Sequence, residues 1–149
     1  MKVQFILGSK SDEDFATEIT KILDEFEIEY DIKVASAHKV PEKVFEIVQQ
    51  NNQEYKELVY ITIAGRSNGL SGVAAANSIH PVIACPPYVD KIDFMANINS
   101  TLIMPSDTPV LTVLDPLNCA LSAIRILALN DDRLREKLKK RLKEVKSKF

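Results

Sequence analysis

Short apolar runs alternate along this chain with longer segments whose apolar residues recur every three or four positions. Runs of this length are typical of buried strands rather than of helices. Strands that alternate with helices form βαβ units, which build a parallel sheet, and right-handed crossovers place helices on both of its faces. The pattern therefore predicts an α/β fold, a three-layer α/β/α sandwich. Strands are expected over residues 3–7, 28–34, 58–64, 82–85 and 110–114.

The segments between these runs carry helix signals. Ser11 or Asp12 can cap a helix that reaches about residue 26, and Pro41 suits the first turn of the next helix. Further helices are expected up to about residue 77, over 90–100 and over 118–129. The last segment, 131–149, is expected to be a C-terminal helical extension. Its apolar stripe consists of Leu134, Leu138, Leu142, Val145 and Phe149.

The composition fits one globular domain over residues 1–149. The formal net charge of −2 gives no reason to expect nucleic acid or an anionic membrane as a partner. No apolar stretch approaches the roughly 18 residues that span a bilayer, and the first residues lack the pattern of a secretion signal. Cys85 and Cys119 are too few for a disulfide framework. We therefore expect a cytoplasmic protein with reduced thiols.

Polar clusters follow the first three predicted strands. They lie at residues 8–12, 36–39 and 65–69. Parallel strands end at the same edge of a sheet, and open α/β sheets bind ligands at that edge. We therefore expect the three clusters to converge on one pocket.

The first cluster has the composition of a phosphate or sugar cradle. Gly8 lets the backbone approach a ligand, and the following helix N-terminus offers free N–H groups. Ser9 and Ser11 add hydroxyl groups, and Asp12 can accept hydrogen bonds from a ribose diol. A simple helix cap is the alternative interpretation. The cluster is neither a Walker loop nor a GxGxxG motif.

His38 is the candidate acid or base of the second cluster. An unperturbed imidazole titrates near ~6.5, so it can exchange protons at cellular pH. Lys39 beside it can hold a phosphate, whereas a surface histidine is the alternative. His80, before the fourth strand, is interpreted as structural. Cys85 can approach the pocket but has no neighbouring base, and the two distant histidines do not predict a metal site.

The third cluster, Gly65-Arg66-Ser67-Asn68-Gly69, combines two glycines with a permanent cation, a hydroxyl and a carboxamide. Such a loop can hold a small anionic or carbonyl-bearing molecule at a strand end. A plain strand-to-helix turn is the alternative.

Three motifs in this order resemble the 5-aminoimidazole ribonucleotide (AIR) carboxylase family of purine biosynthesis: GSKSD, SAHK followed by Pro41-Glu42, and AGRSNGLSG. The resemblance runs from residue 3 to about 129. It implies a flavodoxin-like sheet with strand order 2-1-3-4-5. The segments 88–99 and 104–107 depart from the family pattern.

The resemblance implies reversible carboxylation of AIR at C4 by CO2, giving 4-carboxy-AIR (CAIR), without ATP, biotin or metal. The family's other branch, the N5-carboxyaminoimidazole ribonucleotide mutases, usually carries AGxxxHLPG in the third loop. This chain has no histidine there, and SAHK and ACPP also resemble the direct, class II branch. The mutase activity and a non-catalytic nucleotide-binding module remain the alternatives.

The resemblance also implies roles for individual residues. His38 would be the acid/base. The phosphate and ribose would be bound by the loops carrying Gly8, Ser9, Ser11, Asp12, Ser36, Ala37 and Lys39, with Ser9, Ser36 and Lys39 on the phosphate and Asp12 on the ribose. The CO2 or carboxylate pocket would be formed by Gly65, Arg66, Ser67 and Asn68. A homo-oligomer is implied, an octamer first and a tetramer or dimer as alternatives. The apolar helix over 118–129 and the stripe of 131–149 fit burial at a subunit interface, and docking of the stripe on the body of the chain is the alternative.

Overall fold

A parallel five-stranded sheet forms the centre of the computed structural model, which describes residues 1–149. The strand order is β2-β1-β3-β4-β5, and every neighbouring pair is parallel. This confirms the predicted flavodoxin-like order. The strands are β1 (Lys2–Leu7), β2 (Tyr30–Val34), β3 (Leu58–Ile63), β4 (Val82–Ala84) and β5 (Leu111–Thr112).

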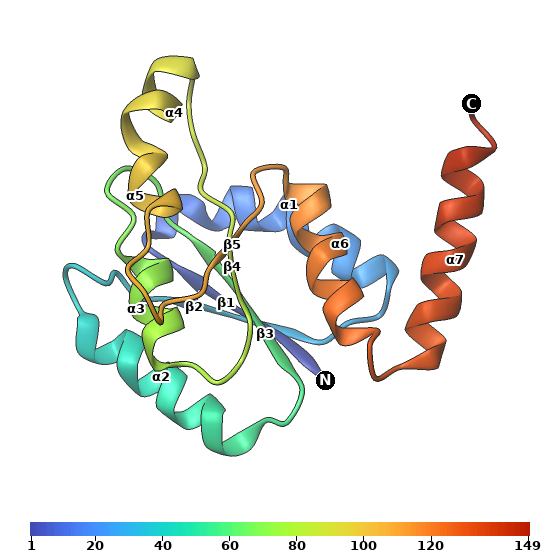
Figure 1. Cartoon of the computed structure of the whole chain (residues 1–149), viewed down its shortest axis with the longest axis horizontal. Coiled ribbons are helices and arrows are strands. Elements are labelled where there is room, and N and C mark those ends of the chain that lie inside the picture. The colour runs from blue at the N-terminus through green and yellow to red at the C-terminus, as the bar shows by residue number, and fades with distance from the viewer.

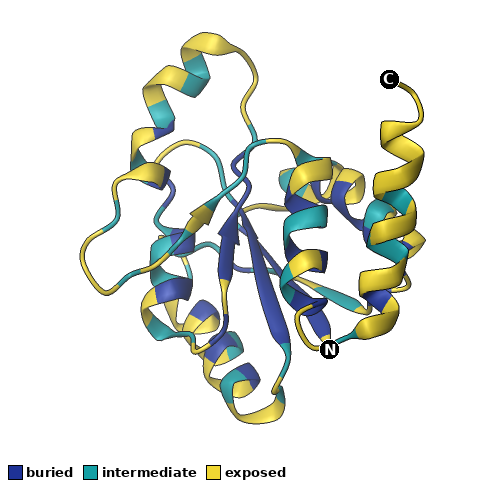
Figure 2. Ribbon diagram, turned by 45° about the vertical axis from the view of Figure 1, so that its right-hand side comes forward, coloured by how far each residue is buried: buried dark blue, intermediate teal, exposed yellow.

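Helices cover both faces of the sheet, as predicted (Figure 1). Side chains alternate along β1, so that Phe5 packs on one face and Ile6 on the other. Figure 2 shows β1, β3 and β4 as the buried centre of the molecule, whereas the edge strands β2 and β5 are partly exposed. One face carries α1 (Glu13–Glu25), α6 (Pro116–Leu127) and, outside them, α7 (Asp132–Lys146), and the other carries α2 (Pro41–Glu54) and α3 (Leu70–Asn77).

The first helix begins at Glu13, directly after Asp12, one of the two predicted cap positions. A single 3₁₀ turn, η1 (Lys10–Asp12), separates β1 from α1. The cap is Ser9, whose hydroxyl accepts from the Ser11 N–H, whereas Asp12 makes no side-chain cap to α1. Asp12 therefore occupies the predicted N-cap position of α1, but its side chain does not form the expected cap. The carboxylate of Asp12 instead folds back onto the Ser9 N–H at 3.0 Å.

The helix expected over residues 90–100 is divided into two. α4 (Lys91–Asn97) is capped by Asp90, and α5 (Asn99–Leu102) follows directly. The two helices form an arm that projects beyond the carboxyl ends of the strands (Figure 1). The largely exposed apolar side chains on α4 include Ile92 and Met95.

The two C-terminal helices use their apolar faces mainly within this chain. The buried residues of α6, such as Cys119 and Ile124, belong to the core, so the chain itself explains the apolar pattern that we attributed to subunit contacts. In α7 only the first part of the predicted stripe docks: Leu134 is fully buried, whereas Leu142 is exposed. No helix is long and apolar enough to cross a bilayer.

Candidate active site

A polar cavity of about 340 Å³ opens at the carboxyl ends of β1, β2 and β3. The three predicted clusters converge there, each on the loop that follows one strand. All the predicted site residues line this cavity except Asn68. The lining is Gly8, Ser9, Ser11, Asp12, Ser36, Ala37, His38, Lys39, Ala64, Gly65, Arg66, Ser67, Gly69 and Leu70.

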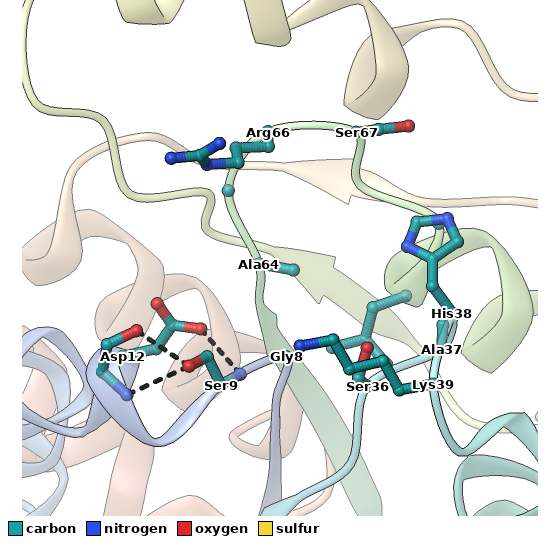
Figure 3. A pocket seen from close by; sticks show the side chains of 14 residues that line it. Gly8, Ser9, Asp12, Ser36, Ala37, His38, Lys39, Ala64, Arg66 and Ser67 are labelled. Atoms are coloured by element: carbon teal, nitrogen blue, oxygen red, sulfur yellow. Dashed lines mark hydrogen bonds between the residues drawn. The ribbon is translucent and has the colours of Figure 1, made fainter.

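The loop after β1 is held by reciprocal hydrogen bonds. The Ser9 hydroxyl accepts from the Ser11 N–H at 3.2 Å and from the Ser11 hydroxyl at 2.9 Å (Figure 3). Burial raises the pKa of the Asp12 carboxyl, and the hydrogen bond from the Ser9 N–H partly opposes this rise. Gly8 meets the β3 end closely, because a Cβ at Gly8 would lie 3.1 Å from the Cβ of Ala64. The N–H groups that we expected to be free are thus used within the loop, which presents its hydroxyl groups to the cavity on a compact frame.

The loop after β2 places His38 and Lys39 on the opposite side of the cavity. Its turn is closed by the Val40 N–H, which donates to the Ser36 carbonyl at 2.9 Å. Figure 3 shows the Lys39 side chain reaching across toward Gly8, while the His38 ring stands beneath the Arg66–Ser67 loop. A cation and a titratable ring therefore face the hydroxyl-rich loop.

The loop after β3 supplies the remaining wall. Arg66 adopts a left-handed backbone conformation, with φ of 55°, which is uncommon for a residue other than glycine. Its side chain and that of Ser67 extend in opposite directions from the loop (Figure 3). Arg66 is one of the lining residues, and its guanidinium extends toward the side of the loop that carries Ser9 and Asp12, where it can face an anion.

Gly69 has a function that the sequence motif alone did not indicate. A Cβ at this position would lie 3.0 Å from Nε2 and 3.3 Å from Cε1 of His38. The backbone φ is −84°, so the glycine is needed for space and not for conformation. The start of α3 thus forms a platform for the imidazole. Ala64 and Leu70 complete the lining residues that we did not predict.

Asn68 does not line the cavity, which corrects its predicted place. Its side chain is buried and turned inward, where Oδ1 accepts from the N–H groups of Leu70 at 3.1 Å and Ser71 at 3.3 Å. These contacts cap the first turn of α3. Its Nδ2 donates to the hydroxyl of Thr101 at 3.0 Å.

Cys85 and His80 lie away from the cavity. The expectation that Cys85 approaches the pocket is wrong, because its side chain is buried between the sheet and α6. Its hydrogen bond with Cys119 and burial raise the pKa of the Cys119 thiol. His80 is buried next to the Tyr60 ring at the amino end of β4, at the opposite edge of the sheet.

The arrangement separates three chemical functions around one cavity. Hydroxyls and the Lys39 ammonium can hold a phosphate, the Asp12 carboxylate can accept from a sugar, and an imidazole faces a guanidinium-bearing loop. No group of three His, Cys, Asp or Glu side chains is placed to hold a metal ion. The site therefore suits a phosphorylated sugar derivative with a group that exchanges a proton.

Comparisons with known proteins find relatives over almost the whole chain. A family model described as AIR carboxylase covers residues 2–148. A phosphoribosylaminoimidazole carboxylase of Archaeoglobus fulgidus is 46% identical over 138 residues, 93% of this chain and 75% of that protein. An N5-carboxyaminoimidazole ribonucleotide mutase of Methanocaldococcus jannaschii is 41% identical over 146 residues, 96% of this chain and 89% of that protein. The crystal structure of PurE from Treponema denticola superposes with a TM-score of 0.93 at 38% identity, covering 99% of this chain and 92% of that one.

Proposed function

Because this chain belongs to the AIR carboxylase family of purine biosynthesis enzymes, we propose that it carboxylates AIR directly with CO2 at C4 to give CAIR. Family membership covers both branches, since relatives of either name match the chain. The observation that favours direct carboxylation is the loop after β3, which has no histidine. His38 is therefore the only imidazole that lines the cavity.

The nucleotide is proposed to bind across the first two loops. The phosphate would contact the hydroxyls of Ser9 and Ser36 and the ammonium of Lys39. The ribose diol would donate to the Asp12 carboxylate. This placement leaves the aminoimidazole between His38 and the loop that carries Arg66.

The proposed reaction needs one carbon–carbon bond and one proton transfer. The 5-amino group makes C4 of AIR electron-rich, so that C4 attacks the carbon of CO2 once both are held in register. The adduct carries a carboxylate and a hydrogen on a tetrahedral C4. His38 removes that proton and restores the aromatic ring, and the reverse reaction protonates C4 and releases CO2.

The third loop is proposed to stabilise the charge that develops. The two oxygens of CO2 gain negative charge as the carbon–carbon bond forms. The guanidinium of Arg66 and the backbone N–H groups of its loop can donate to them. The scheme balances without ATP, biotin or a metal ion.

The mutase activity is the second candidate, because relatives that match over almost the whole chain carry that name. The test supplies AIR with CO2/bicarbonate in one assay and N5-carboxy-AIR in another. We expect CAIR formation in the first. Efficient use of N5-carboxy-AIR alone would overturn the direct-carboxylase proposal. Turnover of neither substrate would favour a non-catalytic nucleotide-binding module.

The enzyme is also proposed to be a homo-oligomer, an octamer first and a tetramer or dimer as alternatives. The exposed apolar side chains of the arm and of the outer half of α7 support this proposal, including Ile92, Met95 and Val145. Residues 131–149 are proposed to contribute to a subunit interface. Light scattering after gel filtration measures the state, and a monomeric enzyme with full turnover would overturn this part.

A further inference from the structure

The short helix α5 does not line the cavity, but it contacts the loop after β3, which does. The hydroxyl of Ser100 accepts from the Asn68 N–H at 2.9 Å. Its own hydrogen is within donating distance of the Arg66 carbonyl at 3.0 Å and of the Asn97 carbonyl at 2.8 Å. One side chain of the arm therefore joins the backbone on both sides of Ser67.

The next residue of α5 makes a second connection to the same loop. The Thr101 hydroxyl accepts from Nδ2 of Asn68, and both side chains are almost completely buried, at 2% and 3% exposure. The other end of the Asn68 carboxamide caps the first turn of α3. A buried amide that uses both of its ends fixes the distance between α5 and the start of α3.

These connections have a consequence for the imidazole. The loop they hold begins at Arg66, whose φ of 55° is an unfavourable conformation that persists only when its surroundings impose it. The loop ends at Gly69, where a Cβ would lie 3.0 Å from Nε2 of the His38 ring, so that any side chain there would push the ring aside. A small shift of the loop would therefore move Arg66 and the platform of His38 together.

We infer that Ser100 and Thr101 are positioning residues for the carboxylation site. They hold the loop over residues 66–69, and through it they set the place of the Arg66 guanidinium and of the His38 ring. Neither side chain lines the cavity. The inference rests on the proposed function for its effect on turnover, while the hold on the loop can be measured separately.

The test uses the full chain with Ser100→Ala and Thr101→Val. The phosphate and ribose are bound by other loops, so KM for AIR should stay nearly unchanged. A misplaced loop should lower kcat by about tenfold to a hundredfold. Ser100→Thr and Thr101→Ser, which keep the hydroxyl, should restore most of the rate. The Asn68 amide should exchange with solvent faster in Ser100→Ala, as measured by NMR.

Ser147→Ala is the matched control. The Ser147 hydroxyl donates to the Glu144 carbonyl at 2.8 Å, the same three-residue helical contact that Ser100 makes with Asn97, but at the end of α7. Ser147→Ala should change neither kcat nor the exchange rate of the Asn68 amide. Each variant is assayed well below its melting temperature, and if Thr101→Val does not fold, Ser100→Ala decides.

Two results would overturn the inference. An unchanged Asn68 exchange rate in Ser100→Ala would show that α5 does not hold the loop. A wild-type kcat in that variant, with faster exchange, would show that the hold does not matter for turnover. If the unmodified enzyme converts neither AIR nor N5-carboxy-AIR, the proposed function fails, and the exchange rates alone decide whether α5 holds the loop.

Discussion

The loops around the cavity and the C-terminal helix α7 are held to the same core by different kinds of interaction. The loops meet one another through close contacts of small or polar groups, such as Gly69 against His38 and Gly8 against Ala64. Helix α7 is attached by the fully buried Leu134 and by exposed ion pairs, among them Lys137 with Glu27 at 2.7 Å.

This difference indicates which property each region controls. A close contact between small groups determines geometry but buries little apolar area, so its loss should alter turnover more than stability. A buried leucine contributes mainly through the apolar area it removes from water, so its loss should alter stability more than turnover. The predictions below test this separation, from the largest expected effect to the smallest.

The largest effect is expected at the proposed acid/base. His38→Asn should lower kcat by about 10²- to 10⁴-fold while nucleotide binding and unfolding free energy stay close to wild type, because only the proton transfer is lost. Steady-state kinetics and calorimetric titration with AIR measure the two effects. His80→Asn, at the other edge of the sheet, is the control. A near-normal rate in His38→Asn would remove His38 from its proposed role.

In α7 we expect a substitution in the core to change the free energy of unfolding more than the rate of turnover. Leu134→Ala should lower the unfolding free energy by about 2–5 kcal/mol, because it leaves a cavity beneath the helix. Leu129→Ala, at an exposed position before α7 and outside the proposed interface, should change it by less than about 0.5 kcal/mol. Denaturant titration measures both. Loss of turnover in fully folded Leu134→Ala would contradict the separation of the two regions.

An added methyl group in the cavity wall should have an intermediate effect. Gly69→Ala places a carbon against the His38 ring and should lower kcat by about tenfold to a hundredfold. The φ of −84° suits alanine, so the melting temperature should not fall. Gly72→Ala, on the same helix, meets only the flexible Met104 side chain and is the control. Equal kcat values in the two variants would exclude Gly69 as the platform.

The smallest effect is expected at the exposed ion pairs between Glu27 and α7. The hydrogen bond from Lys137, its charge and that of Arg133 lower the pKa of Glu27 below its ordinary value of 4.5. A carboxyl with a lowered pKa in the folded state stabilises the fold above pH 4.5 and loses this contribution as the pH falls through the lower value.

Glu27→Gln should therefore lower the melting temperature slightly near neutral pH and converge with wild type in acid. Salt should reduce the difference, because the pairs are exposed. Glu18→Gln, on α1 and without an ion pair, should show no such pH dependence. A difference between Glu27→Gln and wild type that persists below the folded-state pKa would show that the carboxylate charge is not responsible.

Much of the fold could be predicted from the sequence, because the periodicities of strands and helices are local properties. The three polar clusters could be placed on one edge for the same reason, since parallel strands end together. Cys85 and Asn68 could not be placed correctly. Each lies at the end of a strand or in a polar loop, where a side chain can turn either toward the cavity or into the interior.

The sequence by itself determined the α/β alternation, the loops that carry the chemistry and, through three motifs, the family. The tertiary structure decided how these loops are held: that Gly69 supports His38, that Asn68 turns inward, and that α5 contacts the loop after β3. The Asn68–Thr101 contact joins residues 33 positions apart. Such contacts depend on how helices pack across the sheet edge, and no local pattern in the chain encodes that packing.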